Sequence, residues 1–114
     1  MTVIFKIAPD ILWSQARDAG VFTGATIDIT DGFIHLSAAD QVRETAARYF
    51  GGQSGLVLVA IDGDKLGDKL KWEPSRGGAL FPHLYGPLDF SAVIWTKALP
   101  VGTDGLHVFP ELAA

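Results

Sequence analysis

Apolar residues alternate with polar ones in some stretches of the chain and recur at helical spacing in others, which predicts a series of short elements. Residues 3–8 alternate as a strand does, and Pro9 ends that strand. Residues 10–19 have the spacing of an amphipathic helix, which Gly20 terminates. The next stretch, 21–31, is interpreted as a loop or a short irregular strand.

The middle of the chain has a clearer pattern. A short strand is predicted over residues 33–36, followed at once by a helix. Ser37 is typical of a helix N-cap, and Asp40 lies three residues further on, so the two are interpreted as a capping box. The helix is predicted to follow Ser37 directly, to place Val42, Ala46, Tyr49 and Phe50 on one side, and to end at Gly51 and Gly52. The apolar run 56–61 is typical of a central strand.

The second half is richer in glycine and proline. Short strands are predicted over residues 70–73 and 91–99, with a weaker one over 106–109. The intervening stretch 74–90 contains repeated Gly and Pro breakers and is interpreted as a long ordered loop. Two helices near the N-terminus and five or six short strands predict an α+β fold with a mostly antiparallel sheet. No linker divides residues 1–114, so a single domain is expected.

Composition removes several functional classes. The formal net charge is −4, the nine Lys and Arg residues are scattered, and nucleic-acid or membrane-surface binding is therefore not expected. The chain has no cysteine, which excludes disulfides, cysteine-ligated zinc and a cysteine nucleophile. Neither a signal peptide nor a membrane-spanning run is recognisable, so a cytoplasmic location is expected.

The stretch GFIHLSAADQV, residues 32–42, contains the first candidate site. In a strand, Ile34 and Leu36 would face the core, while His35 and Ser37 would share the opposite, less buried face. A helix start beside them would suit an anionic or phosphate-bearing ligand. The alternative is a histidine that only hydrogen-bonds to the backbone at the margin of a sheet.

A second candidate lies in FPHLYGPL, residues 81–88. Its prolines and Gly86 restrict the backbone around His83 and Tyr85, so that an imidazole and a phenol are held on a stiff segment. The same residues can instead close one end of the core.

Glu73 is the third candidate, between Trp72 and Pro74. A carboxylate beside a large apolar ring can have its pKa raised, although a plain surface glutamate is the commoner outcome. His35, His83 and Glu73 have the residue types of a metal site, but no short ligand spacing supports one, so no metal is expected.

Several of these blocks together resemble the bacterial family called domain of unknown function 952, over about residues 4–99. The blocks are GFIHLSAADQV, RYFGG, LVLVAID, KWEP and FPHLYGPL. The resemblance implies an ADP-ribosyltransferase-like fold, related to NAD-dependent transferases and RNA 2′-phosphotransferases, with no reaction assigned to the family itself. By the same resemblance, His35 and Ser37 match the second-strand motif on the nicotinamide side. Glu73, or the loop with His83 and Tyr85, matches the later element that orients the ribose.

One position departs from the family pattern. The first strand of the family commonly reads I-Y-H-I, whereas residues 4–7 here read I-F-K-I. Lys6 can pair with a phosphate as a point charge, but it has neither a neutral imidazole nor the fork of an arginine.

Three hypotheses follow. The first is a glycosyl or phosphoryl transferase that acts on a nucleotide such as NAD. Its catalytic residues would be Glu73, His35 and His83, and its ligand contacts would be Lys6, Ser37, Tyr85 and Gly86. The second is a non-catalytic module that binds a nucleotide-like small molecule. The third is that both histidine motifs only stabilise the fold.

Overall fold

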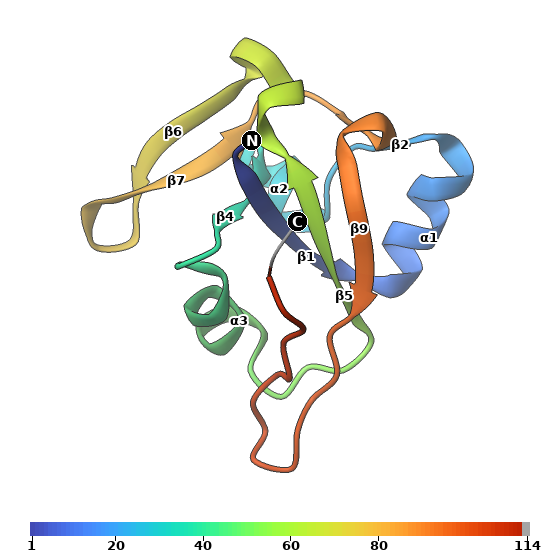
Figure 1. The fold of residues 1–114 in the computed structure, drawn as a ribbon, viewed down its shortest axis with the longest axis vertical. Coiled ribbons are helices and arrows are strands. Elements are labelled where there is room, and N and C mark those ends of the chain that lie inside the picture. The colour runs from blue at the N-terminus through green and yellow to red at the C-terminus, as the bar shows by residue number, and fades with distance from the viewer. Residues whose placement is uncertain (113–114) are drawn as a thin grey trace.

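The computed structural model describes residues 1–112, apart from the side chain of Arg76. Its largest sheet is antiparallel, with the strand order β4-β1-β5-β9 (Figure 1). These strands are Ser37–Ala38 (β4), Val3–Pro9 (β1), Leu56–Asp62 (β5) and Val93–Ala98 (β9). A second antiparallel sheet has the order β3-β7-β6, formed by Ile34–His35 (β3), Ala79–Leu84 (β7) and Leu70–Ser75 (β6). Val21–Phe22 (β2) pairs with Leu88–Asp89 (β8).

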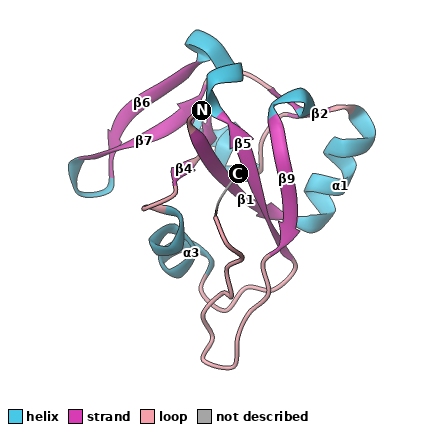
Figure 2. Cartoon of the chain, in the orientation of Figure 1, coloured by secondary structure: helices cyan, strands magenta, loops and turns pink. Residues whose placement is uncertain are grey.

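Three α-helices lie in the described part of the chain: Asp10–Ala19 (α1), Thr26–Asp31 (α2) and Val42–Phe50 (α3). Figure 2 shows α1 and α3 on opposite sides of the long strands β1 and β5. Short 3₁₀ segments span Gly63–Lys69, Arg76–Gly78 and Phe90–Ala92. No helix within residues 1–112 is long and apolar enough to cross a bilayer.

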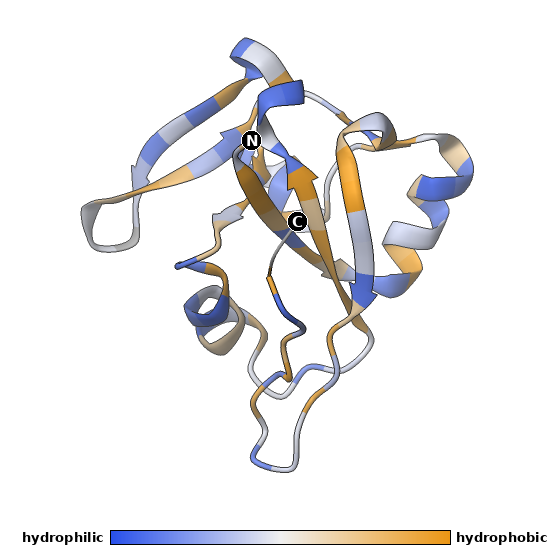
Figure 3. Ribbon diagram, in the orientation of Figure 1, coloured by the Kyte–Doolittle hydropathy of each residue, from blue (hydrophilic) through white to orange (hydrophobic). Residues whose placement is uncertain are grey.

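Alternation along β1 divides the core into two clusters. Ile4 and Ala8 pack in one cluster with residues of α1, including Trp13. Phe5 and Ile7 point to the other face, where the residues of α3 lie. Figure 3 shows the resulting apolar character of β1 and β5. The predicted strands 3–8 and 56–61 are therefore confirmed, because a strand covered on both faces needs apolar residues on both.

The α+β class and the antiparallel pairing are confirmed, but the expected number of helices is wrong. Residues 21–31, interpreted as a loop or irregular strand, contain α2. This helix has only six residues, too few for helical periodicity to be recognised. Its start is held by Asp28, whose Oδ2 accepts a hydrogen bond from the Ala25 N–H at 2.8 Å. Gly32 ends it with φ +86°, a left-handed conformation that favours glycine.

The predicted capping box at Ser37 is also wrong. Ser37 lies in β4, and α3 begins only at Val42 with Gln41 as its N-cap. The Gln41 side chain makes the local contacts instead: its Oε1 accepts from the Ala38 N–H at 2.9 Å, and its Nε2 donates to the Leu80 carbonyl at 2.7 Å. Pairing with β1 keeps Ser37 extended, which overrides its local preference for a cap.

Two predictions for the second half of the chain are corrected. The stretch 74–90 is not a long loop, because β7 forms within it and pairs with β6 from Leu70↔Leu84 to Ser75↔Ala79. Backbone pairing between these segments overrides the proline and glycine breakers. The weak strand expected over 106–109 is reduced to an isolated bridge between Val101 and His107.

Candidate functional site

Asp28 is the centre of a buried hydrogen-bond network between α2, β1 and β3. It is 2% exposed. Its Oδ1 accepts from the backbone N–H of His35 at 3.0 Å and lies 2.7 Å from the His35 Nδ1. Its Oδ2 lies 2.8 Å from the Lys6 Nζ. Asp28 therefore joins α2, β1 and β3 through one carboxylate.

Lys6 supplies the charge opposite Asp28. Its ammonium lies 3.1 Å from Oδ1 and 2.8 Å from Oδ2 of Asp28, and it also donates to the His35 carbonyl at 3.0 Å. The whole residue is 4% exposed. The charge that was expected to pair with a ligand phosphate thus makes these contacts within the protein.

For both Lys6 and Asp28, burial shifts the pKa in one direction and ion pairing shifts it in the other. Burial lowers the pKa of the Lys6 ammonium, and the charge of Asp28 opposes that shift. Burial alone would raise the pKa of Asp28, but the hydrogen bond from His35 and the charge of Lys6 outweigh it. The pKa of Asp28 is therefore well below its ordinary value, and the carboxylate is ionised.

Both ring nitrogens of His35 face carboxylates from α2. Nδ1 lies 2.7 Å from Asp28 Oδ1, and Nε2 lies 3.0 Å from Asp31 Oδ2. A carboxylate only accepts hydrogen bonds, and a neutral imidazole has only one N–H. His35 can therefore donate to both partners only as an imidazolium.

The register of β3 and β7 places His35 directly opposite His83. Their ring centroids are 5.8 Å apart. Phe33 lies on the same face and stacks on the His83 ring at 4.1 Å, and it also contacts the His35 ring at 4.6 Å. Two candidate residues from distant parts of the sequence are thus brought together by backbone pairing.

A second carboxylate holds His83. Glu73 Oε1 lies 2.8 Å from the His83 Nδ1 and accepts a hydrogen bond from the Tyr85 hydroxyl at 2.6 Å. His83 is 6% exposed, while the Glu73 side chain is 36% exposed. Glu73 and the segment with His83 and Tyr85, which the sequence offers as alternatives for one element, are therefore joined in one hydrogen-bonded chain.

The expected direction of the Glu73 pKa is wrong. Hydrogen bonds from Tyr85 and then His83 stabilise its charged form and lower its pKa. Trp72 does not act on Glu73 as expected, because successive residues of β6 point to opposite faces. The same bond raises the pKa of the Tyr85 hydroxyl.

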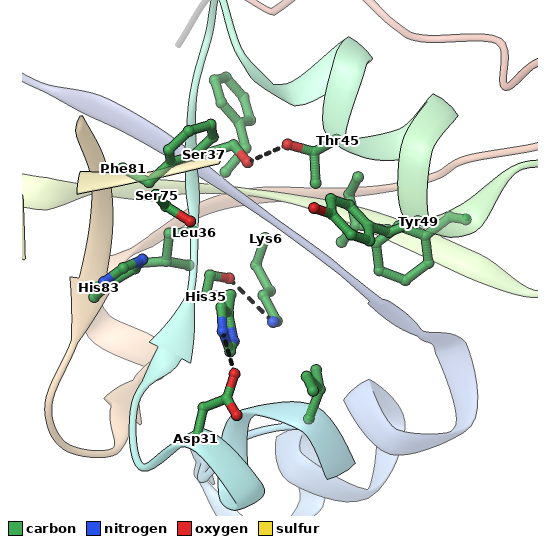
Figure 4. Close-up of a pocket in the computed structure, with 14 residues that line it drawn as sticks. Lys6, Asp31, His35, Leu36, Ser37, Thr45, Tyr49, Ser75, Phe81 and His83 are labelled. Carbon is green, nitrogen blue, oxygen red and sulfur yellow. Dashed lines mark hydrogen bonds and ion pairs between the residues drawn. The ribbon is translucent and has the colours of Figure 1, made fainter. Parts of the chain in front are cut away.

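A pocket of about 520 Å³ lies between the second sheet, β1, α2 and α3. Figure 4 shows His35 and Asp31 at one end, Ser37 and Phe81 at the other, and Tyr49 on the side opposite His83. Apolar and aromatic side chains make up much of the wall, and a few polar groups converge on it, as in ligand sites generally. The lining residues are Phe5, Lys6, Ile7, Ile27, Asp31, His35, Leu36, Ser37, Thr45, Tyr49, Phe50, Ser75, Phe81 and His83.

The predicted site residues are distributed unevenly around this pocket. Lys6, His35, Ser37 and His83 line it. Glu73 and Tyr85 do not line it and reach it through His83. Gly86 lines a separate, smaller hollow of about 230 Å³. Ser37 is 4% exposed, and its hydroxyl lies 3.0 Å from that of Thr45.

Asp28 and Asp31 are the polar residues that the sequence reading missed. The stretch 21–31 is interpreted from its sequence as a loop or irregular strand, and its burial runs against residue type: Ile27 and Ile29 are 57% and 68% exposed, whereas Asp28 between them is buried. One signal was available: Lys6 lies in an otherwise apolar strand, and a charge buried there requires a partner of opposite charge. That signal indicates that a carboxylate exists without indicating which one.

The comparisons with known proteins agree with this fold. The family model described as protein of unknown function (DUF952) matches residues 7–96. The crystal structure of protein CC0527 from Caulobacter crescentus is similar, with a TM-score of 0.90, 50% identity and coverage of 94% of both chains. Its solution NMR structure has a TM-score of 0.83 and 51% identity, covering 93% of this chain and 91% of that one. No curated protein sequence matches the chain.

Proposed function

We propose a function for a chain that belongs to the DUF952 family of proteins of unknown function: its pocket binds a nucleotide-like small molecule, and His83 is the acid–base residue that acts on it. The observation that carries the proposal is the difference in hydrogen bonding between the two ring nitrogens of His83. One ring nitrogen is fixed by a carboxylate, and the other is left open toward the pocket.

The hydrogen bond to Glu73 selects the tautomer of His83. Because the carboxylate accepts, His83 Nδ1 donates to Glu73 Oε1, and the neutral ring then has its lone pair on Nε2. No described residue hydrogen-bonds that Nε2. Within the described residues no fully buried side-chain nitrogen or oxygen lacks a partner, so Nε2 keeps some exposure, and His83 is one of the residues that line the pocket.

A carboxylate-oriented imidazole with a free Nε2 is suited to general-base chemistry. In glycosyl transfer from NAD, a hydroxyl or water oxygen would form a bond to the ribose carbon while the bond to nicotinamide breaks. The proton of the attacking oxygen would move to His83 Nε2. Glu73 and Tyr85 are positioning residues in this proposal, since they act through His83.

NAD is the first substrate to test because the family resemblance implies an ADP-ribosyltransferase-like fold. The aromatic wall formed by Phe81 and Tyr49 suits a stacked base. A phosphoryl-transfer reaction would use His83 in the same way.

A non-catalytic binding module is the second candidate, and a specific observation favours it. Lys6 replaces the histidine common in the family, and its charge is compensated by Asp28. Even with Lys6 paired to Asp28, the pocket can still bind a nucleotide without catalysing transfer of any group.

Calorimetry with NAD and with ADP-ribose, followed by chromatographic detection of released nicotinamide, tests the proposal. We expect micromolar binding by the wild-type protein and release of nicotinamide that His83→Gln abolishes. His107→Gln is the matched control, because His107 is half-buried, contacts the Gln53 carbonyl and does not line the pocket. Binding without any product would favour the module. No heat with either ligand would contradict both candidates.

A further inference from the structure

His35 has two carboxylate partners that differ in how firmly they are held. Asp28 is buried and accepts from Ala25, Lys6 and His35. The Asp31 side chain is 40% exposed and lines the pocket. The Asp31 Oδ2 lies 3.0 Å from the His35 Nε2. Asp31 is also the last residue of the six-residue α2, directly before Gly32. Asp28 is therefore a fixed partner, whereas Asp31 can turn toward solvent at little cost.

The charges of this network do not balance without Asp31. With His35 in the imidazolium form that its two carboxylate contacts require, Lys6 and His35 each carry one positive charge, and Asp28 carries one negative charge. The three groups together thus leave one positive charge at the wall of the pocket, and Asp31 neutralises it across the His35 Nε2.

We infer that Asp31 occupies the position of an oxyanion of the ligand, and that a phosphate or carboxylate group displaces it to accept the hydrogen bond from His35 Nε2. The inference rests on the proposed function in that it takes the same pocket as the ligand site. The incoming oxyanion gains a charge-assisted hydrogen bond and restores the charge balance that Asp31 provided. Once displaced, the Asp31 side chain rotates into the solvent, where a carboxylate is well solvated.

The His83 base and the His35 oxyanion site then have separate tasks. Because the two rings lie on neighbouring strands, one ligand can place a phosphate at His35 and a hydroxyl near His83. Asp31 would prevent weakly binding anions from occupying the site, since any anion has to compete with Asp31 for the hydrogen bond from His35 Nε2.

Calorimetry on Asp31→Ala tests the inference, with inorganic phosphate and ADP-ribose as anionic probes and adenosine as the neutral one, at constant ionic strength. We expect Asp31→Ala to bind both anions about tenfold more tightly than the wild type, the gain from removing one competing charge-assisted hydrogen bond. Adenosine affinity should not change. Asp18→Ala is the matched control, because it removes the same charge from an exposed position on α1 outside the pocket.

The His35 ring provides a second readout that does not depend on a variant folding. In ¹⁵N-histidine-labelled wild-type protein, phosphate should move the His35 Nε2 resonance and leave Nδ1, which faces Asp28, nearly unchanged. His35→Gln, which cannot carry the charge, should abolish phosphate binding.

The outcomes separate this inference from the proposed function. Equal affinity of wild type and Asp31→Ala for ADP-ribose would overturn the oxyanion site and leave the pocket in place. An equal gain for Asp18→Ala would show a general charge effect and overturn it as well. Failure of both the wild type and Asp31→Ala to bind any of the probes would overturn both proposals, whereas loss of binding in Asp31→Ala alone would overturn only the oxyanion site.

Discussion

His35 and His83 face each other across one pair of strands, but the networks behind them lie in different surroundings. The first network, of Lys6, Asp28 and His35, is closed to solvent around Asp28. The second, of Glu73, His83 and Tyr85, has its carboxylate at the surface. Charge–charge attraction is strong where water is excluded and weak where it is not. We therefore expect the first network to govern stability and the second to govern chemistry.

The largest effect is expected for Asp28→Asn. Removing the carboxylate charge leaves the Lys6 ammonium buried without a counter-charge, which should lower the free energy of unfolding by about 3–5 kcal/mol. Urea denaturation monitored by tryptophan fluorescence measures this. The double variant Lys6→Met/Asp28→Asn should recover part of the loss, since it removes the unpaired charge. A loss below about 1 kcal/mol for Asp28→Asn would contradict the assignment, because an exposed ion pair contributes no more than that.

The pH dependence of stability should come from the same carboxylate. The pKa of Asp28 in the folded protein lies below its value of about 3.9 in the unfolded chain. Its contribution is thus fully present above about pH 4 and is lost as the pH falls through the folded-state pKa. The slope from this one group is at most about 1.4 kcal/mol per pH unit. Urea titrations from about pH 6 down to about pH 2 should show the wild type converging on Asp28→Asn. A constant difference between the two proteins would be the contrary result.

Glu73→Gln breaks the second network and should barely change stability, because the carboxylate is at the surface. Its effect should appear in the His83 ring. A glutamine side chain offers both a donor and an acceptor, so it no longer fixes the proton on Nδ1. Imidazole ¹⁵N chemical shifts report the tautomer directly. A ring that remains wholly Nδ1-protonated in Glu73→Gln would show that Glu73 does not select the tautomer.

The smallest effect is expected for Tyr85→Phe. The Tyr85 hydroxyl makes the largest contribution to lowering the Glu73 pKa. Its removal should therefore raise that pKa toward the ordinary value and leave the contact to His83 in place. A ¹³C-detected titration of the Glu73 carboxyl measures the shift. Tyr49→Phe serves as the control, because Tyr49 is the other tyrosine of the chain and lines the pocket without bonding Glu73. Equal shifts in both variants would contradict the role of Tyr85.

Some of the fold could be read from local pattern. The strand over residues 3–8, the helix over 10–19 and the apolar run 56–61 each have a period or a composition that a single window of sequence displays. Helix α2 and strand β7 do not have such a signal. One is too short for periodicity, and the other contains a proline and is stabilised by its pairing with β6.

The candidate site shows the same limit. The chemistry of His35, His83, Glu73 and Tyr85 could be suspected from residue type and from the stiff segments that hold them. Their grouping depends on the register His35↔His83, which no local window encodes. Asp28 was missed because its partner Lys6 is 22 residues away in the chain.

The sequence by itself determined which segments are apolar on both faces and which side chains can exchange a proton, because both are properties of the residues and their nearest neighbours. Only the tertiary structure decided which carboxylate each histidine contacts and which of the two carboxylates is shielded from water. Those choices depend on backbone pairing between distant segments, and the strength of each charge pair depends on the solvent that the folded chain excludes.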